Sequence, residues 1–360
     1  MQFDSQKSPS KNLSRASLHR YIKKNLARIQ RQTMVSPAPT IRVAVTQAEP
    51  VWLDLDASVA KGCKYIKEAA ENGARLVTFP EVWFPGYPAW IWKRPVDFAL
   101  GTAYQKNSLK IDSPQMRTLC ACAAENDIAV CFGFSENASH SLYIAQALIG
   151  ADGQVKMTRR KLKPTHMERT IFGDATGNSL QNVVGVEGVG RVSALACWEH
   201  LQPLLKYHTA ALRPEIHVGA WPPVIPYVEG AGLWSMSREG CRNLSRTFAA
   251  ESQTFVLHTT AVIGQAGIDK LGTEGTMFGV PGGGSSAIYG PDGRQLSEDI
   301  EETEEGILYA DLDFDEVLRS KSFVDITGHY SRPDLLWLGS DDREKLPLRT
   351  HRDGENGGEA

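Results

Sequence analysis

The chain has 360 residues, of which 42% are hydrophobic and 22% charged, and its formal net charge at pH 7 is −3. This composition is typical of a globular chain and excludes collagen, a coiled coil and an intrinsically disordered protein. No apolar run reaches the roughly 18 residues of a membrane-spanning helix, and the charge gives no global attraction to nucleic acid or acidic lipid. The sequence therefore favours an enzyme that acts on small molecules.

The predicted elements alternate between short β-branched strands and amphipathic helices, which indicates one continuous α/β body. We expect strands at 41–47, 75–79, 128–134, 143–150, 154–158, 191–196, 216–220 and 254–260. We expect helices at 57–72, 113–126 and 235–251, and another that begins near residue 201. Residues 286–289 and 306–311 are predicted to form a last hairpin that flanks the turn at 290–293.

The two ends of the chain differ from this body. Residues 1–34 carry eight Lys or Arg against one acid, Asp4, as in a mitochondrial presequence. The weak apolar face of this segment instead favours a flexible extension over residues 1–39. Residues 339–360 are polar and Gly-rich, which predicts a disordered tail. The single folded domain is therefore expected at 40–338.

Six cysteines are too few and too irregularly spaced for a disulfide framework in a chain of this length. This favours a reducing compartment, and we expect a cytoplasmic protein. Cys120 and Cys122 form a C-x-C pair without a second Cys or His pair at zinc-site spacing. We expect neither a metal nor another cofactor.

Three segments place reactive side chains where a predicted strand ends, the usual position of ligand sites in α/β proteins. They are F-P-E at 79–81, R-R-K-L-K-P-T-H at 159–166 and A-C-W-E-H at 196–200. Each has a plainer explanation: a solvated glutamate, an exposed basic face and a buried inert cysteine. Together, however, a thiol, a carboxylate and a cation provide a nucleophile, a proton acceptor and a group that stabilises a developing anion.

These motifs, with G-H-Y-S-R-P-D at 328–334, resemble the nitrilase superfamily of carbon-nitrogen hydrolases, and the likeness covers essentially all of 40–338. The resemblance implies a four-layer αββα sandwich. By position, it implies that Glu81 is the general base, Lys161 the cation and Cys197 the nucleophile. Glu168 matches a second glutamate beside this triad. Its alternative is a structural ion pair with Arg169 or Arg160.

Local sequence around these residues is similar to the nitrilase branch, whose substrates are organic nitriles. Segments 196–208, 234–240 and 281–286 resemble fungal-type arylacetonitrilases. The cyanide hydratases have an Asn-Cys-Trp-Glu-Asn pattern, from which Ala196 and His200 depart. The implied activity is hydrolysis of arylacetonitriles to the carboxylic acid and ammonia through a cysteine thioimidate and thioester, with some amide as by-product.

Four side chains near the triad are expected to bind the substrate. Trp83 and Tyr87 belong to an aromatic stretch that follows the proposed base, and they are suited to an arylalkyl pocket. Trp198 and His200 flank the nucleophile, and the backbone N–H of Trp198 is a candidate donor to the charge that develops on the substrate. Packing or subunit contact is the alternative role for the aromatic stretch.

The expected partners are a small-molecule nitrile and other copies of the chain, with no nucleic acid and no membrane. The resemblance implies dimers that assemble into larger spirals, and residues 328–334 are a candidate contact region. The alternatives that keep the same triad are an amidase and a cyanide hydratase. A thiol-redox protein lacks a C-x-x-C motif, a nucleic-acid binder would depend on one short basic run, and an inactive scaffold would not need the complete triad.

Overall fold

The computed structural model describes residues 40–230, 232–346 and 348. The predicted N-terminal extension lies outside these residues, as do positions 347 and 349–360 of the predicted tail. Residues 339–346 contain no helix or strand, but the Gln181 side chain donates a hydrogen bond to Asp342 in this segment (3.1 Å). No helix in the described part of the chain is both long and apolar enough to cross a bilayer.

The described residues contain strands and helices in close alternation. The strands are β1 (Thr40–Ala48), β2 (Leu76–Thr78), β3 (Ala129–Ala138), β4 (Ser141–Ile149), β5 (Val155–Arg160), β6 (Val183–Val186), β7 (Gly190–Ala196), β8 (Ile216–Trp221), β9 (Phe255–Ala261), β10 (Ala287–Tyr289) and β11 (Gly306–Asp313). The α-helices are α2 (Leu55–Glu71), α3 (Phe98–Asn107), α4 (Pro114–Glu125), α5 (Pro203–Ala211), α6 (Arg238–Ser252), α7 (Gln265–Leu271) and α8 (Asp315–Phe323). Each predicted element is present within a few residues, whereas β6, α3, α7 and α8 were not predicted.

Helix caps explain several boundaries. The side chains of Asp54 and Ser113 accept hydrogen bonds from the first turns of α2 and α4, and Pro114 follows as the first residue of α4. Helix α6 begins after Ser237, which accepts a bond from the Gly240 N–H, and ends where Gln253 takes a left-handed conformation.

Strand β1 joins two groups of strands into one continuous sheet. On one edge β1 pairs with β2 through Val43–Val45 and then with β9 through Gln47–Ala48, while β11 pairs along its other edge. The first group therefore has the order β5-β4-β3-β2-β1-β11, and the second has β6-β7-β8-β9-β10. Among the described strands, the ladder between the two groups is the two-residue pairing of β1 with β9, and elsewhere the groups face one another.

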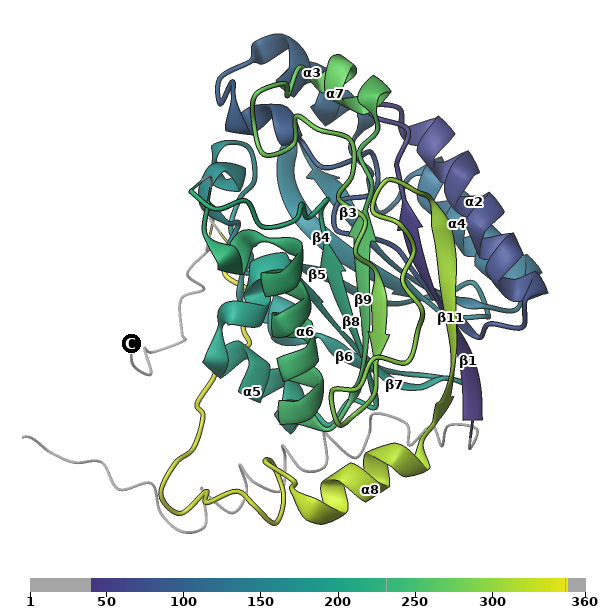
Figure 1. The fold of residues 1–360 in the computed structure, drawn as a ribbon, viewed down its shortest axis with the longest axis vertical. Helices are drawn as coiled ribbons and strands as arrows, with labels where there is room; N and C mark the ends of the chain where they lie inside the picture. Colours follow the sequence, from purple (N-terminus) through teal and green to yellow (C-terminus); the bar gives the residue numbers. More distant parts are fainter. Residues whose placement is uncertain (1–39, 231, 347, 349–360) are drawn as a thin grey trace, which may run out of the picture.

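Three apolar clusters separate four layers. Helices α2 and α4 pack on the outer face of the first group, and α5 and α6 pack on the outer face of the second (Figure 1). Between the two groups lies a core to which almost every strand contributes, for example Val45, Leu148, Val192 and Val218. The alternation along β1, with Ala44 facing the helices and Val43 and Val45 facing the inner core, follows from the two-residue period of a strand. The predicted αββα sandwich is confirmed.

The predicted hairpin of β10 and β11 is wrong. Strand β10 pairs antiparallel with β9 in the second group, and β11 pairs antiparallel with β1 in the first. The turn at 290–293 does form, because Gly293 has φ +85° and the Gly290 N–H bonds to the Arg294 carbonyl. After this turn, Gln295 forms a single antiparallel bridge with Tyr289 of β10, and the chain then crosses to the first group of strands, where it forms β11.

Candidate active site

Strands β2, β5, β7 and β8 all point in the same direction, so their carboxyl ends lie at one edge of the sandwich. Strand β2 is parallel to β3, the antiparallel β4 separates β3 from β5, and β7 is parallel to β8 and β9. Glu81 follows β2, Lys161 follows β5 and Cys197 follows β7. The topology therefore brings together three side chains that are far apart in sequence.

Glu81 is fully buried on a tight turn after β2. Its N–H donates to the carbonyl of Trp221 at the end of β8 (3.2 Å), and the next residue, Val82, has φ +50°. Gly133 of β3 lies directly beneath this turn. A Cβ at Gly133 would meet the Glu81 Cα at 2.7 Å and the Pro80 carbonyl oxygen at 2.4 Å, so only glycine allows the turn to lie this close.

Lys161 lies between two buried carboxylates. Its Nζ donates to Glu81 Oε1 (2.9 Å) and to Glu168 Oε2 (2.8 Å), and none of the three residues is more than 2% exposed. Burial raises the pKa of Glu81, and the repulsion of Glu168 adds to it, so that the pKa reaches about 8 despite the attraction of Lys161. Burial would lower the pKa of Lys161, but Glu168 and Glu81 outweigh it and hold that pKa well above its usual range. One ammonium is thus shared by two carboxylates.

Glu168 is held on the 3-10 helix His166–Thr170. Besides Lys161, its oxygens accept hydrogen bonds from the Thr165 N–H (2.6 Å) and the Tyr87 hydroxyl (3.2 Å). The alternative ion pairs do not form, because Arg160 binds Glu136 and the Arg169 guanidinium donates to the His166 carbonyl. The second glutamate therefore lies with the triad.

Cys197 begins the 3-10 helix Cys197–Leu201 directly after β7, in a left-handed conformation with φ +49°. A non-glycine residue adopts this conformation only when its surroundings hold it there. Burial raises the pKa of its thiol well above the usual range, and the negative charge of Glu81 adds to this, while Lys161 opposes it. The resting side chain is therefore a thiol that needs a base.

A buried ion pair fixes the two loops that carry Lys161 and Cys197. Glu199 accepts two hydrogen bonds from the Arg159 guanidinium (both 2.7 Å), one from the Leu162 N–H (2.9 Å) and one from the Ala196 N–H (2.9 Å). Leu162 follows Lys161, and Ala196 precedes Cys197. A single carboxylate thus holds both loops in register.

An apolar cavity of about 390 Å³ opens beside this cluster, which is within the size range of small-ligand pockets. Cys197 and Glu168 form part of its wall, and most of the other side chains that line it are aromatic or aliphatic. The other lining residues are Tyr87, Trp92, Thr165, His166, Trp198, Trp221, Pro222, Pro223, Val224, Leu233, Met236, Cys241, Met277 and Phe278. The cavity suits an apolar molecule whose reactive end reaches Cys197.

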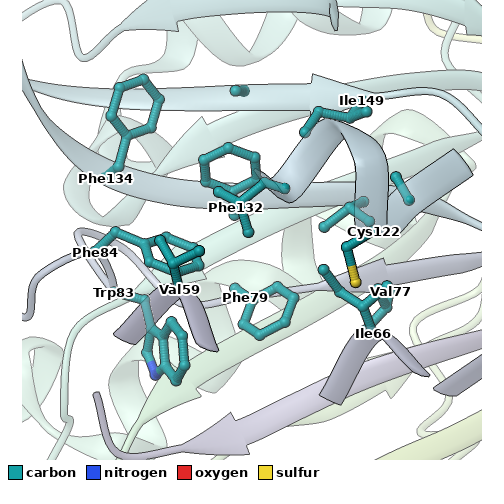
Figure 2. Close-up of a cluster of buried hydrophobic side chains, with 14 of the residues drawn as sticks. Val59, Ile66, Val77, Phe79, Trp83, Phe84, Cys122, Phe132, Phe134 and Ile149 are labelled. Carbon is teal, nitrogen blue, oxygen red and sulfur yellow. The ribbon is translucent and has the colours of Figure 1, made fainter. Parts of the chain in front are cut away.

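Of the four predicted substrate-binding residues, two line the cavity and two do not. Tyr87 and Trp198 line the cavity, but the prediction for Trp83 is wrong. Its ring packs with Phe79 and Phe84 in the core under α2, and its Nε1 donates to the Ala48 carbonyl (Figure 2). The backbone reverses within the turn after Glu81, which directs Trp83 away from the cavity.

The prediction of His200 as a substrate-binding residue is also wrong. Its side chain is fully buried, hydrogen-bonds to the Cys197 carbonyl and stacks on the Trp221 ring. It is not among the residues that line the cavity. Sequence adjacency to Cys197 therefore indicated proximity to the nucleophile but not access to the substrate.

Several residues around the site were missed from sequence. Of the hydrophobic wall, Trp221, Met277 and Phe278 lie outside the motif segments, and Met236 lies in segment 234–240, for which no pocket role was predicted. Glu199 was recognised as part of the cysteine motif, but its partner Arg159 was treated only as one of a basic run. A charged residue at an alternating position of a buried strand was the available signal, because a charge there needs a partner. Within the described ranges, no group of three or more His, Cys, Asp or Glu side chains is placed to hold a metal ion.

Comparisons with known proteins agree with this geometry. Residues 42–321 match the family model of the carbon-nitrogen hydrolases. The chain is 64% identical to an arylacetonitrilase of Aspergillus kawachii over 86% of this chain and 94% of that protein, and 60% identical to an arylacetonitrilase of Hypocrea virens over 88% and 96%.

Solved structures share the fold at lower sequence identity. A carbon-nitrogen hydrolase from Helicobacter pylori superimposes with a TM-score of 0.62 at 17% identity and covers 79% of this chain and 92% of that one. A C145A mutant of the Nesterenkonia AN1 amidase gives a TM-score of 0.57 at 19% identity over 79% and 95%. The sequence match and the cluster around Cys197 lead to one conclusion: this chain belongs to the carbon-nitrogen hydrolase family.

Proposed function

We propose that the protein is a nitrilase that hydrolyses arylacetonitriles to the carboxylic acid and ammonia. The observation that carries the proposal is the Lys161 ammonium shared by Glu81 and Glu168 beside the Cys197 thiol, at an apolar cavity. The relatives of 53 to 64% identity that bear the name arylacetonitrilase support the substrate class.

The first step uses Glu81 as the base. Its Oε2 atom is buried and has no hydrogen-bond partner among the described residues, whereas Oε1 is bound to Lys161. Oε2 is therefore the oxygen that accepts the Cys197 proton as the sulfur attacks the nitrile carbon, and this proton passes to the nitrile nitrogen to give a thioimidate. The high pKa of Glu81 makes its acid form a proton donor near neutral pH.

Water then adds to the thioimidate carbon, and a carboxylate removes a proton from it. Lys161 and the Trp198 N–H stabilise the charge that develops in this step. Protonation of the nitrogen and its departure as ammonia leave a thioester, and a second water releases the acid and regenerates the thiol. If the carbon–sulfur bond breaks first, the amide leaves after only one water has been consumed. Glu81 and Glu168 lie on either side of Lys161, and their negative charges stabilise the protonated nitrogen of the intermediate. This favours loss of ammonia, and therefore the acid as product.

The substrate is expected to place its aryl group among the cavity side chains. Tyr87 and Trp92 form one side, and the Tyr87 ring packs on Phe278 with a centroid distance of 5.4 Å. Such a wall provides apolar and ring–ring contacts for an aryl group but few hydrogen bonds for a polar one. A methylene between ring and nitrile would allow the ring to turn into the cavity while the nitrile carbon reaches Cys197.

The test is release of ammonia and acid from phenylacetonitrile, compared with benzonitrile, a short aliphatic nitrile, cyanide and phenylacetamide. Preferred turnover of phenylacetonitrile by the wild type, with none by Cys197→Ala, is the expected result. Cys120→Ala is the matched control, because Cys120 is a free cysteine on α4 outside the cavity. Turnover of cyanide or of the amide alone would reject the nitrilase assignment in favour of a cyanide hydratase or an amidase.

We also propose that the protein forms homo-oligomers, with dimers that assemble into larger spirals. Large apolar side chains in the segment after α8 support this, because Leu335, Leu336 and Trp337 are 59%, 80% and 78% exposed. They follow directly on residues 328–334, the candidate contact region. Light scattering of the full chain should give a mass well above that of one chain, and a monomer at working concentration would refute this proposal.

A further inference from the structure

Two buried histidines form a hydrogen-bonded row behind the nucleophile, and no step of the mechanism above uses them. His200 Nδ1 lies 2.7 Å from the Cys197 carbonyl oxygen, and His200 Nε2 lies 2.9 Å from His217 Nε2. His217 Nδ1 in turn lies 2.8 Å from the Ser193 hydroxyl. All three side chains are fully buried.

The Cys197 carbonyl and the neutral state of the two rings together fix the direction of every bond in this row. A carbonyl oxygen only accepts, so His200 Nδ1 must carry the proton and donate. Burial lowers the pKa of His200 to about 4, so the ring is neutral near pH 7 and its Nε2 is an acceptor. His217 must then donate from Nε2. Burial lowers the pKa of His217 well below its usual range, so this ring is neutral too and its Nδ1 accepts from the Ser193 hydroxyl, which lies closer to it than to the Ile216 carbonyl (2.8 against 3.4 Å).

The carbonyl at the end of the row belongs to the peptide that links Cys197 to Trp198. The N–H of that same peptide is the Trp198 N–H, the second residue of a helical turn, where no intrahelical acceptor is available. A hydrogen bond to the carbonyl of a peptide withdraws electrons from it and strengthens the N–H as a donor.

We propose that His200 is a positioning residue, oriented by His217 and Ser193, that holds and polarises the Cys197–Trp198 peptide so that its N–H stabilises the developing charge on the substrate. The role of His200 rests on the proposed function, which requires a donor at this place. The bond also supports the left-handed Cys197 backbone, because it fixes the orientation of the peptide that follows it.

Histidine stacking alone does not account for the arrangement. The ring of His200 does stack on Trp221 (centroids 5.1 Å apart) and meets Phe248, so an apolar ring would fill the same space. A third buried histidine, His258, has the contacts expected of a histidine that only packs. It likewise has a serine partner, with Nδ1 2.8 Å from Ser245 Oγ, but no group in the part of the chain that the structure describes hydrogen-bonds to its Nε2.

The experiment compares His200→Leu with His200→Asn. The amide nitrogen of asparagine is attached to Cγ, as is Nδ1 of histidine, so it can still donate to the Cys197 carbonyl, whereas leucine cannot. We expect kcat for phenylacetonitrile to fall on the order of 10- to 100-fold in His200→Leu, with KM changed less than about threefold. His200→Asn should recover most of the lost kcat.

A second readout separates polarisation from loss of the folded site. Alkylation of Cys197 by iodoacetamide needs the thiol but no donor to a developing oxyanion or nitrogen anion, so its rate should be nearly unchanged in His200→Leu. His217→Gln and His217→Leu repeat the comparison one residue further away. Glutamine keeps a donor toward His200 Nε2, so only the leucine variant should lose kcat.

His258→Leu is the matched control for removal of a buried histidine, and it should retain kcat within about threefold. The proposal is overturned if His200→Leu keeps its kcat, if His200→Asn and His200→Leu lose it equally, or if His258→Leu loses as much. Failure of the wild type to hydrolyse any nitrile would reject the proposed function instead, and the wild-type assay comes first.

Discussion

Two buried groups of charges lie side by side at the end of β5 and behave in opposite ways. Arg159 and Glu199 form a balanced pair, in which the carboxylate accepts four hydrogen bonds. Lys161 is shared by Glu81 and Glu168, and one oxygen of Glu81 has no hydrogen-bond partner within residues 40–230, 232–346 and 348. Burial opposes ionisation of Glu199, but Arg159 and the backbone donors outweigh it and lower its pKa, whereas the pKa of Glu81 is raised to about 8.

The contrast shows that burial alone does not make a carboxylate reactive. Both glutamates are nearly inaccessible to solvent, and both have a cation within 3 Å. The difference is the ratio of carboxylates to cations and the number of N–H donors that reach each one. A fully bonded carboxylate keeps its charge and fixes the backbone, and an incompletely bonded one exchanges a proton near neutral pH.

Among the residues of these two charged groups, the largest effect is expected at Lys161. Lys161→Arg should reduce kcat at least about 10³-fold, because a planar guanidinium cannot take the place of a compact ammonium between two carboxylates in a closed site. Steady-state rates with phenylacetonitrile measure the effect. Lys163→Arg, at an exposed lysine paired with Asp174, is the control and should leave kcat unchanged. Near-normal turnover of Lys161→Arg would contradict the proposal that catalysis needs one compact ammonium shared by Glu81 and Glu168.

A change to the Arg159–Glu199 pair should affect mainly the free energy of unfolding. Glu199→Gln leaves the Arg159 charge buried and without an anionic partner, which costs about 3–5 kcal/mol in the free energy of unfolding. The release of the loops at Leu162 and Ala196 should also lower kcat. Chemical denaturation measures the first effect. Asp174→Asn breaks an exposed pair and should cost at most about 1 kcal/mol. Equal losses in the two variants would contradict the structural assignment of Glu199.

The pH dependence should report Glu81 and not Glu199. Glu81 must be unprotonated to accept the Cys197 proton, and its pKa is raised to about 8, so kcat/KM should fall about tenfold for each pH unit below that value. The pKa of Glu199 is lowered, so it stays ionised throughout this range. Initial rates from about pH 6 to 10, with thermal unfolding at each pH as the control, provide the test. A limb near the ordinary carboxylate pKa would contradict the prediction.

The smallest effect is expected from the hydrogen bond that Tyr87 donates to Glu168, at the edge of the cluster of Lys161 and its two carboxylates. Tyr87→Phe removes the hydroxyl that donates to Glu168 Oε1. The altered Glu168 should change the acid-to-amide ratio a few-fold, because that carboxylate helps to stabilise the charged nitrogen. Chromatography of both products measures the ratio. Trp83→Phe should change thermal stability but neither the ratio nor KM, since Trp83 packs in the core. A shift in the ratio for Trp83→Phe alone would reverse the assignment of the two aromatic residues.

The sequence predicted those parts of the molecule that depend on local periodicity and on motifs. The strands at the core and the capped helices α2 and α4 have clear two-residue or helical patterns and cap residues. The motif segments also led to Glu81, Lys161, Glu168 and Cys197, and the structure places them at one edge. Their position follows from strands that run in one direction, which the order of the motifs alone does not require.

The rest depended on tertiary contacts. Strands β10 and β11 flank a good turn sequence, but β10 pairs with β9 and β11 pairs along the nine-residue β1, so no hairpin forms. Trp83 and His200 are close in sequence to Glu81 and Cys197. Their side chains nevertheless face the core, because a tight turn and a 3-10 helix do not follow the two-residue alternation of a strand.

The pairing of β1 with β11 has a consequence for biosynthesis. Thr40 pairs with Asp313 and Gln47 with Gly306, so one whole edge of the strand that joins the two halves of the sandwich is paired by residues more than 250 positions later in the chain. Contacts of such wide sequence separation slow folding and leave a strand edge open until they form. On a ribosome, the edge of β1 therefore stays uncovered until residues 306–313 have left the exit tunnel. During that interval a nascent chain is most exposed to mispairing with its neighbours, and a chaperone that binds extended segments would act there.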